Sequence, residues 1–308
     1  GEKLLFRWDL DKTCLRTEFD SIGDLVRTAF ESASKKRTIP GAAALLREIG
    51  RTEPAGIFIL SGSPTQLRGV IELKLRNDGI QWDRLDLKPQ LQHLVRGRFR
   101  FLKDQVGYKL ERLLRSRSVV PHHIDEYLFG DDAEADAFIY SLYADIGRGA
   151  VGEHELLTVL ELAGAYVDAV PRIAALARNL PRGFAARRIF IHLDRASAPS
   201  NFDDFGLRVC PFHNYLQPAL VLFADGVISA DVLLRVTTEL VVNEGFTFDA
   251  MVASYRDLAQ RGYLGGSPIK RLKESLTPSH DALFPLSYRL AMRALVDLEN
   301  SDLIHAVD

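Results

Sequence analysis

The chain is poor in cysteine, tryptophan and methionine, with two of each among 308 residues. Two cysteines, Cys14 and Cys210, cannot form a disulfide framework or a cysteine-based zinc site. Such a chain tolerates a reducing compartment, and we therefore expect a cytoplasmic protein. The printed sequence also opens without a signal-peptide pattern.

The chain also lacks an excess of charge of one sign, because 41 acidic residues balance 39 basic ones. A general attraction to polyanions is thereby excluded, and any anion must be bound locally. No run reaches the ~18 apolar residues that a membrane-spanning helix needs. The best candidate, 216–236, is interrupted by Asp225 and Asp231, and it predicts a buried strand followed by a helix.

Hydrophobic residues make up 47% of the chain, enough for a sizeable core. Four short apolar runs, at 3–9, 56–60, 127–129 and 188–193, end in polar or glycine residues, which is typical of buried strands. Helix-sized intervals separate these runs, and apolar residues at 24–30 and 41–49 show helical spacing. The pattern predicts an α/β fold with a mainly parallel sheet, whose active site lies at the carboxyl ends of the strands.

The second half of the chain contains no motif that we can assign. One or two further strands are expected between Cys210 and Phe223, and a helical pattern follows Gly226. We therefore expect a catalytic domain at 1–225 and a C-terminal helical extension at 226–308 that packs on it.

Helix boundaries can be predicted within this C-terminal region. Ser229 and Thr247 stand where N-caps belong, since their side chains can accept a hydrogen bond from the first helical turn. Gly245 and Gly262 stand where helices end.

Residues that could carry chemistry follow predicted strands or lie in a predicted helix. Each signal is weak by itself, but their order and placement are specific. Because the carboxyl ends of parallel strands meet at one edge of a sheet, residues that are distant in sequence are expected to converge there. The pieces are Asp9-Leu-Asp11-Lys-Thr13, Ser61, Lys109 within Gly107 to Leu114, and Gly130-Asp131-Asp-Ala-Glu-Ala-Asp136.

Clustered carboxylates at strand ends are typical of a magnesium site, because Mg²⁺ prefers oxygen ligands and keeps several waters. The expected ligands are Asp9, Asp131 and the backbone carbonyl of Asp11. Asp9 is the expected nucleophile, which forms an aspartyl-phosphate. Asp11 is expected to protonate the leaving oxygen and then to deprotonate the hydrolytic water. This is the chemistry of a Mg²⁺-dependent phosphatase.

Phosphoryl oxygens gather negative charge during transfer, so donors and cations must face them. Ser61 offers a hydroxyl and Lys109 an ammonium, which would also offset the repulsion among the acids. Lys103, six residues before Lys109, is the alternative lysine. Asp136, five residues past Asp131, is expected to orient Lys109 or a metal-bound water.

These pieces resemble the haloacid dehalogenase (HAD) superfamily, and more narrowly its App1-like phosphatidate phosphatase branch, which is related to lipin catalytic domains. The narrower resemblance rests on 9–13 with Thr17, on 60–67 and on 130–136. It covers roughly the first half of the chain. It implies a three-layer α/β sandwich with a Rossmann-like, mainly parallel sheet, a small or absent cap, and phosphatidate as the substrate.

The resemblance also implies roles for single residues, and it favours Lys109 over Lys103. Two residues depart from the branch, namely Lys12, where an acid is usual, and Asp132, where a serine is common. The implied nucleophile and acid/base are Asp9 and Asp11, the implied phosphate-binding residues are Thr13, Ser61, Gly62 and Lys109, and the implied metal ligands are Asp9, Asp11 and Asp131.

Caps that select substrates in this superfamily are inserted between the motifs. Between Thr13 and Ser61 lie 47 residues, and between Ser61 and Lys109 another 47, which is too short for a large cap once core helices are subtracted. The expected open site favours lipid head groups or macromolecules over small metabolites. The helical region from Ser229 onward could instead cover the opening, or bind a second copy or a partner.

Residues 96–117 hold eight basic and two acidic side chains. A solvated helix face is the default interpretation of such a run. The alternation of Arg98 and Arg100 with Phe99 and Phe101, however, predicts a strand or loop near Lys109. A basic rim there would suit an anionic head group, a membrane surface or a nucleic-acid backbone.

We therefore expect a phosphate monoester phosphatase whose partner is a phosphorylated substrate, such as a lipid head group at a membrane surface. The first alternative is a non-catalytic module that binds a phospholipid or a phosphoprotein. The second is a phosphatase that acts on nucleic-acid ends. The presence of both Asp9 and Asp11 favours an enzyme over the binding module.

Overall fold

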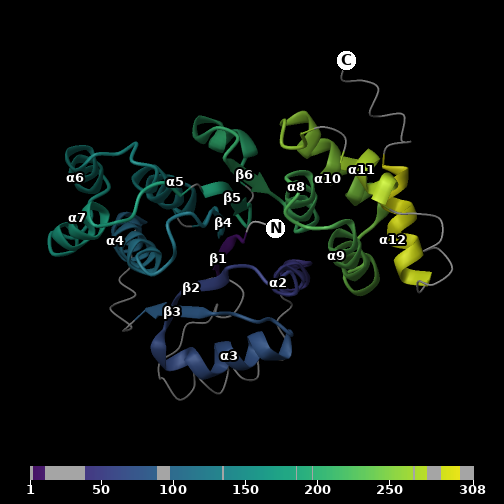
Figure 1. Cartoon of the computed structure of the whole chain (residues 1–308), viewed down its shortest axis with the longest axis horizontal. Coiled ribbons are helices and arrows are strands. Elements are labelled where there is room, and N and C mark those ends of the chain that lie inside the picture. Colours follow the sequence, from purple (N-terminus) through teal and green to yellow (C-terminus); the bar gives the residue numbers. More distant parts are fainter. Residues whose placement is uncertain are drawn as a thin grey trace. The chain divides into compact units, whose positions relative to one another are not determined.

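The computed structural model describes residues 3–10, 39–88, 98–133, 135–184, 186–195, 197–265, 268–275 and 286–298. In these ranges strands alternate with helices, and the last third is helical (Figure 1). The strands are β1 (Leu5–Asp9), β2 (Gly56–Pro64), β3 (Arg84–Lys88), β4 (Glu126–Asp131), β5 (Ala186–His192) and β6 (Val209–Phe212).

Helices precede and follow most of these strands. The first group is α2 (Ala42–Gly50), α3 (Arg68–Asn77), α4 (Arg98–Arg117), α5 (Asp136–Gly147), α6 (Glu153–Leu162) and α7 (Ala169–Arg178), with the 3-10 helices η1 (Thr65–Leu67) and η2 (Pro199–Phe205). The second group is α8 (Leu216–Ala224), α9 (Ala230–Asn243), α10 (Phe248–Gln260), α11 (Pro268–Ser275) and α12 (Leu286–Asp297).

The strands form one parallel sheet in the order β3-β2-β1-β4-β5-β6. The expected α/β fold with a parallel sheet and a helical C-terminal region is therefore confirmed. The chain adds strands outward from β1 on one side and from β4 on the other, so the order reverses between these two strands. Ligands of open α/β sheets bind outside the carboxyl ends at such a reversal. The predicted acids of β1 and β4 flank it.

Strand β1 presents different chemistry on its two faces. Phe6 and Trp8 point to one face, where the ring of Trp8 stacks on that of Phe129 with 4.0 Å between centroids. Phe129 in turn stacks on Phe190 of β5 at 4.8 Å. Arg7 and Asp9 alternate with these aromatic residues and therefore point to the opposite face. The aromatic layer fixes the strand whose last residue is the predicted nucleophile.

Contacts divide the chain into two compact units. The first unit is made of 1–29, 54–72 and 82–211, and it contains β1 to β5, most of β6, and α4 to α7. The expected domain boundary at residue 225 stays a prediction.

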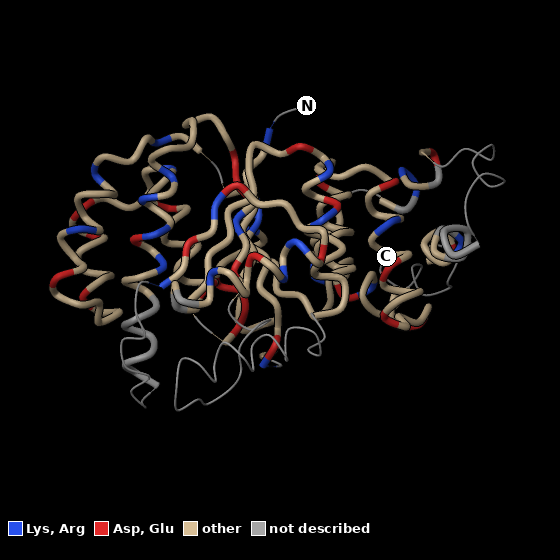
Figure 2. The backbone as a smooth tube through the Cα atoms, turned by 90° about the horizontal axis from the view of Figure 1, so that it is seen from below, with Lys and Arg blue, Asp and Glu red and all other residues tan. Residues whose placement is uncertain are grey.

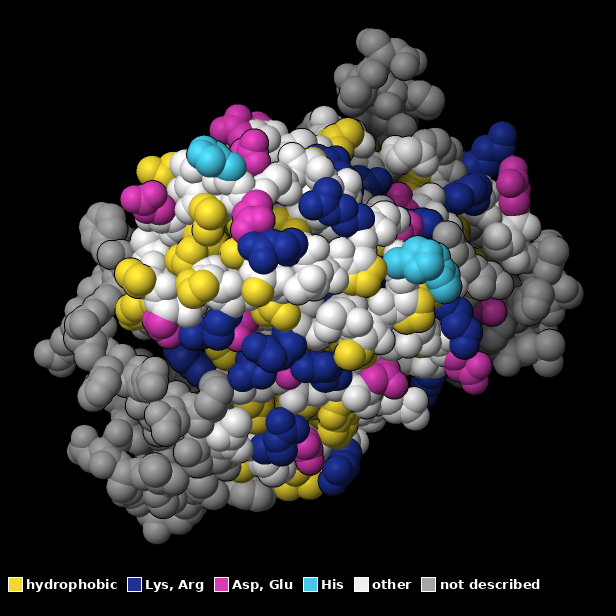
Figure 3. All heavy atoms as spheres, turned by 60° about the vertical axis from the view of Figure 1, so that its left-hand side comes forward, with side chains coloured by type: hydrophobic (Ala, Val, Ile, Leu, Met, Phe, Trp, Pro, Cys, Tyr) yellow, Lys and Arg dark blue, Asp and Glu magenta, His cyan; other side chains and the backbone are white. Residues whose placement is uncertain are grey.

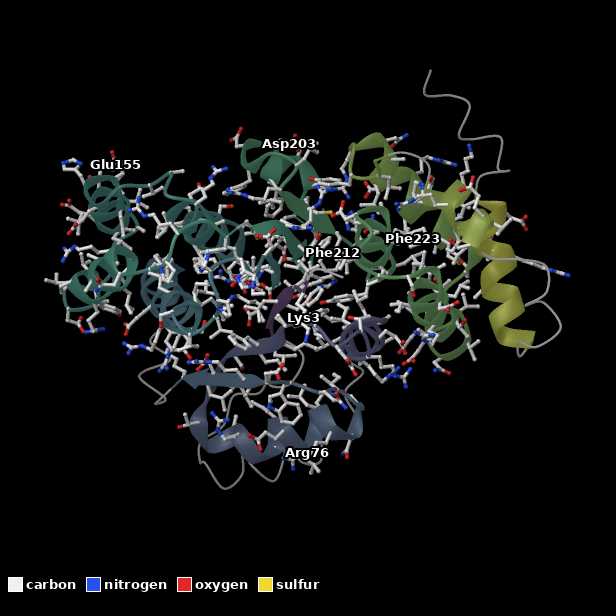
Figure 4. The ribbon with its side chains drawn as sticks, viewed as in Figure 1. Lys3, Arg76, Glu155, Asp203, Phe212 and Phe223 are labelled. Carbon is white, nitrogen blue, oxygen red and sulfur yellow. The ribbon has the colours of Figure 1, made fainter. Side chains whose placement is uncertain are left out.

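The core of the first unit lies between the sheet and helices α4 to α7. Val106 and Leu110 of α4, Tyr140 of α5 and Ile173 of α7 pack with Ile189 of β5 in one buried cluster. Figure 1 shows α6 and α7 as the outermost helices of this group, and Figure 4 labels Glu155 on the outer side of α6. Helix α4 lies between this outer pair and β1.

The second unit, made of 30–53, 73–81 and 212–308, contains α2 and α8 to α12. Both predicted N-caps are confirmed, since the side chain of Ser229 accepts a hydrogen bond from Val232 N and that of Thr247 accepts one from Ala250 N. The two predicted helix ends are also confirmed. Gly245 follows α9 and Gly262 follows α10, both with positive φ, the backbone conformation that favours glycine.

Two predictions of secondary structure are wrong. Of the one or two strands expected between Cys210 and Phe223, β6 supplies one, which ends at Phe212. The start of 216–236 was also expected to be a strand, but it forms helix α8, whose residues from Leu216 to Phe223 are all buried. A short run that is apolar on every side carries no periodicity, so it fits a buried strand and a buried helix equally. Residues 98–101 were expected to be a strand or loop but begin helix α4. The helix predicted at 24–30 lies outside the described residues.

None of the described helices combines the length and the apolar character that crossing a bilayer requires.

Basic and acidic residues are interspersed along the helices of the first unit (Figure 2).

Candidate active site

The predicted site residues of the first unit meet at the carboxyl edge of the sheet. Asp9 ends β1 and pairs in register with Leu60, so it lies beside Ser61 of β2. Trp8 pairs with Phe129 on the other side, so Asp9 is level with Gly130 of β4 and is one residue from the level of Asp131. The convergence that the sequence predicted for these residues is therefore present.

Helix α4 brings Lys109 over the end of β1. The Lys109 ammonium donates hydrogen bonds to Oδ2 of Asp9 and, at 2.6 Å, to Oδ1 of Asp136. The side chains of these three residues are at most 2% exposed. A buried ammonium is costly unless carboxylates pair with it, and here two of them do. Asp136 thus contacts Lys109, one of the two groups that it was expected to orient.

Asp136 begins α5 and holds the end of β4 with its second oxygen. Its Oδ2 accepts a hydrogen bond from the backbone N–H of Asp131 at 3.0 Å. This approach requires glycine at position 130, because a Cβ there would lie 2.4 Å from Oδ2 of Asp136. Sequence reasoning missed this role of Gly130, since a glycine at the end of a strand also fits an ordinary turn.

Ser61 lies where the register of β2 against β3 shifts, between Ser61 and Pro64. Such an irregularity redirects the side chains of a strand. Ser61 is 1% exposed, and its Oγ accepts a hydrogen bond from the backbone N–H of Ser63 at 3.1 Å. The backbone of Gly62 lies within the same irregular stretch.

Asp132 connects the ends of β4 and β5, a role that sequence reasoning also missed. Its backbone N–H donates to the carbonyl of His192 at 2.9 Å. Its carboxylate accepts hydrogen bonds from the backbone N–H groups of Arg195 at 2.8 Å and Ser197 at 3.2 Å. A serine could not accept both bonds through two separate oxygens, which gives a structural reason for aspartate here. No sequence signal distinguished this residue from its acidic neighbours.

Three predicted features lie outside what the structure describes. These are Asp11 and Thr13, which follow β1, and the side chain of Lys103. The two lysines therefore cannot be compared directly. Lys109 is the one whose ammonium contacts Asp9.

The described acids fit a divalent cation. Asp9 and Asp131, at the ends of neighbouring strands, supply two carboxylates, and Mg²⁺ commonly takes only one or two from a protein. Together with Asp136 they carry three formal negative charges against one positive charge on Lys109, which leaves −2. Among the described residues no group of three His, Cys, Asp or Glu side chains is arranged to hold a metal, and Asp11, the third expected ligand, is not among them.

A second buried ionic cluster lies under α4 towards the amino edge of the sheet. The carboxylate of Glu126 accepts bonds from Arg7 Nε at 2.8 Å, Arg117 Nη1 at 2.7 Å and the Tyr143 hydroxyl at 2.8 Å. Lys109 and Arg117 are eight residues apart in α4, about two turns, so one helix contacts both clusters. These four cluster residues therefore fix α4, and through it the ammonium of Lys109.

The charges of this second cluster are mutually dependent. Burial by itself would raise the pKa of Glu126, but the ion pairs with Arg7 and Arg117 and the hydrogen bond from Tyr143 lower it. Burial raises the pKa of the Tyr143 hydroxyl well above its ordinary value, and the neighbouring Glu126 raises it further. The cluster is thus held as one carboxylate, two guanidinium groups and a neutral phenol.

Comparison with known families agrees with this geometry. Residues 8–151 match the family model described as phosphatidate phosphatase APP1, catalytic domain. The match begins at the end of β1 and continues past α5, and it includes Asp9, Ser61, Lys109, Asp131 and Asp136. The App1-like resemblance is thereby confirmed for this region, which is that of a phosphoric monoester hydrolase and implies phosphatidate phosphatase activity. Neither the curated proteins nor the solved structures yielded a match to the chain.

Proposed function

We propose that this protein removes the phosphate of phosphatidate through an aspartyl-phosphate on Asp9, with Mg²⁺ as its metal. The observation that supports this most is the shared ammonium of Lys109, which contacts both Asp9 and Asp136 inside the region that matches phosphatidate phosphatases. A buried cation beside a carboxylate at a strand end suits the transfer of an anionic phosphoryl group.

The first half of the reaction forms the covalent intermediate. A carboxylate oxygen of Asp9 attacks phosphorus, and the bond between phosphorus and the glycerol oxygen breaks. That oxygen takes a proton from Asp11, so diacylglycerol leaves as a neutral alcohol. Lys109 and the hydroxyl of Ser61 stabilise the charge on the phosphoryl oxygens during this step.

The second half regenerates the enzyme. Asp11, now ionised, takes a proton from water as the water attacks phosphorus, and the bond to Asp9 breaks to release inorganic phosphate. Asp136 keeps the ammonium of Lys109 in place through its 2.6 Å hydrogen bond. Mg²⁺, held by Asp9, Asp11 and Asp131, would neutralise phosphoryl charge and orient the phosphate when bound.

The decisive variant is Asp9→Asn, which keeps the shape of the side chain and removes the nucleophilic charge. We expect the wild type to release phosphate from phosphatidate in mixed micelles and from an aryl phosphate, and a chelator of divalent cations to stop both reactions. Asp9→Asn should lose activity by on the order of 10³-fold or more. The matched control is Asp203→Asn, an exposed aspartate of η2, which should behave as the wild type.

Each alternative function gives a different result. Turnover that survives in Asp9→Asn would exclude the aspartyl-phosphate. A binding module would give no metal-dependent turnover of either substrate, although it would still bind phospholipid. A nucleic-acid phosphatase would release phosphate from 5′-phosphorylated oligonucleotides faster than from phosphatidate.

A further inference from the structure

We propose that the α6–α7 turn, residues 162–168, and the cation pair Lys88 and Arg112 bind the surface of an anionic lipid bilayer beside the active site. The inference rests on the proposed function, because a lipid phosphate must be reached where the lipid lies. It goes further by assigning the contact to a particular surface of the first unit.

The α6–α7 turn exposes apolar side chains to water. Leu162 at the end of α6 is 83% exposed, Val167 is 90% exposed and Tyr166 is 45% exposed. These three lie within six consecutive residues, whereas single exposed apolar residues are common on any protein surface. Exposed aliphatic side chains with a nearby tyrosine are the residues that enter the boundary between lipid head groups and acyl chains.

The turn lies at the carboxyl edge of the sheet, where the site is. A Cβ on Gly107 of α4 would be 3.7 Å from the Cβ of Ala169, the first residue of α7. Further along, Arg172 of α7 pairs with Glu111 of α4 at 3.3 Å, so the two helices run in the same direction. Helix α4 runs from Lys109, at the carboxyl edge of the sheet, to Arg117, at the amino edge. Gly107 precedes Lys109 and therefore lies farther out on the carboxyl side. The turn that precedes Ala169 lies on this side as well.

Two cations border the ring of Tyr108 on the same helix. Lys88 Nζ, at the carboxyl end of β3, is 5.8 Å from the centroid of this ring, and Arg112 Cζ is 5.5 Å from it. Both cationic side chains belong to half-buried residues, and in the described part of the chain neither pairs with a carboxylate. Unpaired cations of this kind attract an anionic surface.

Lipid fits these observations better than a protein partner does. The negative charge of Asp168, in the turn, is balanced by Arg172 at 3.1 Å. Glu161, next to the turn, is then the acid whose charge the cations of Lys88 and Arg112 must outweigh. Figure 3 shows apolar and basic side chains gathered next to one another on the side that carries α4, α6 and α7. An apolar tip beside cations matches the apolar interior and anionic head groups of one bilayer.

The test measures binding to vesicles that contain no substrate. Wild-type protein is sedimented with phosphatidylcholine vesicles, with and without phosphatidylserine. The apolar variant is Leu162→Ser with Val167→Ser, and its matched control is Leu207→Ser, a 55% exposed leucine that precedes β6 at the opposite edge. We expect the apolar variant to bind phosphatidylserine vesicles on the order of tenfold more weakly.

The cation variant is Lys88→Gln with Arg112→Gln. Its matched control is Arg115→Gln, which removes a basic residue from the same helix that is already paired with Glu111 at 2.9 Å. Each lost cation should weaken binding by about fivefold, since a basic residue near an anionic membrane contributes ~1 kcal/mol. On vesicles of phosphatidylcholine alone, the cation variant should bind as the wild type does. Circular dichroism should show that every variant is folded.

The results separate this inference from the proposed function. Wild-type binding of phosphatidylserine vesicles by both double variants would overturn the inference even if phosphatidate is hydrolysed. So would weakened self-association of the variants in place of weakened vesicle binding, since that outcome assigns the surface to a second copy. Vesicle binding that depends on the turn and the cations would support the inference even if Asp9→Asn shows that the proposed reaction is wrong.

Discussion

Lys109 and Asp136 have no exposed side-chain surface, and a hydrogen bond of 2.6 Å between them joins α4 to the start of α5. The same ammonium also bonds Asp9, so two carboxylates depend on one cation. A structural pair and a predicted catalytic residue are thereby coupled.

Replacing Lys109 by methionine should cost both stability and activity. The variant removes the ammonium that the buried carboxylates of Asp9 and Asp136 both contact, and breaking a buried ion pair in this way costs roughly 3–5 kcal/mol. Urea denaturation measures the loss in the free energy of unfolding. Arg178→Met is the control, since Arg178 pairs with Glu153 on the surface, where their side chains are 61% and 48% exposed, and it should cost far less than Lys109→Met. Equal losses for the two variants would contradict the role given to burial.

Gly130→Ala should destabilise the protein although it adds only a methyl group. The new Cβ would stand 2.4 Å from Oδ2 and 2.7 Å from Cβ of Asp136, so the end of β4 or the start of α5 must shift. Gly69→Ala in α3 is the matched control, because nothing lies within 4 Å of its Cβ position. That control should be stabilising by about 0.5–1 kcal/mol, as expected for glycine replaced within a helix.

The steric origin of the Gly130 effect can be tested separately. Adding Asp136→Gly to Gly130→Ala removes every atom of residue 136 that clashes, its Cβ included. The double variant should then lose less free energy of unfolding than the sum of the two single variants. Simple additivity would show that the methyl group acts in some other way.

Stability should fall in acid partly because of Glu126. Its pKa in the folded protein lies below the ordinary value of 4.5, so below that pH the unfolded chain binds a proton more readily than the folded one. The stabilisation is therefore complete above the unfolded pKa, and it is lost as the pH falls through the folded pKa. Glu126→Gln should be less stable at neutral pH and should show a smaller decline of unfolding free energy below pH 4.5. If the free energy of unfolding fell equally with pH in the wild type and in Glu126→Gln, Glu126 would not contribute to the loss of stability in acid.

Asp132→Ala should loosen the segment after β5 without unfolding the protein. The amide protons of Arg195 and Ser197 lose the carboxylate that accepts them, at 2.8 Å and 3.2 Å, and should exchange with solvent faster. Hydrogen exchange resolved by residue measures this. Asp132→Asn keeps one carbonyl oxygen as an acceptor and should restore part of the protection. Unchanged exchange in the alanine variant would contradict the contact.

The carboxyl-edge residues were predictable because strands β1, β2 and β4 each end in a visible change from apolar to polar. The short strand β3 was missed, since its residues Arg84 to Lys88 alternate between buried and half-buried and give a weak signal. The cluster of Arg7 with Glu126 was also missed. These residues are 119 positions apart, and only the finished sheet brings them together.

Misread segments share a physical cause. Residues 98–101 alternate between basic and aromatic, which suits a strand, but they are continuous with the helical sequence that holds Lys109. Segment 216–223 has no polar side that would reveal a period. The local sequence pattern did not determine the secondary structure of either segment. The rest of helix α4 determined it for 98–101, and burial in the core determined it for 216–223.

Trp8 is one of only two tryptophans in the chain, and it immediately precedes Asp9. Its indole is 3% exposed and stacks on Phe129, whereas the other, Trp82, lies before β3 at the margin of the sheet. The protein therefore carries an intrinsic fluorophore next to its proposed nucleophile. The variant Trp82→Phe would make the tryptophan emission report on this strand alone, so that ligand or metal uptake could be followed optically without an attached dye.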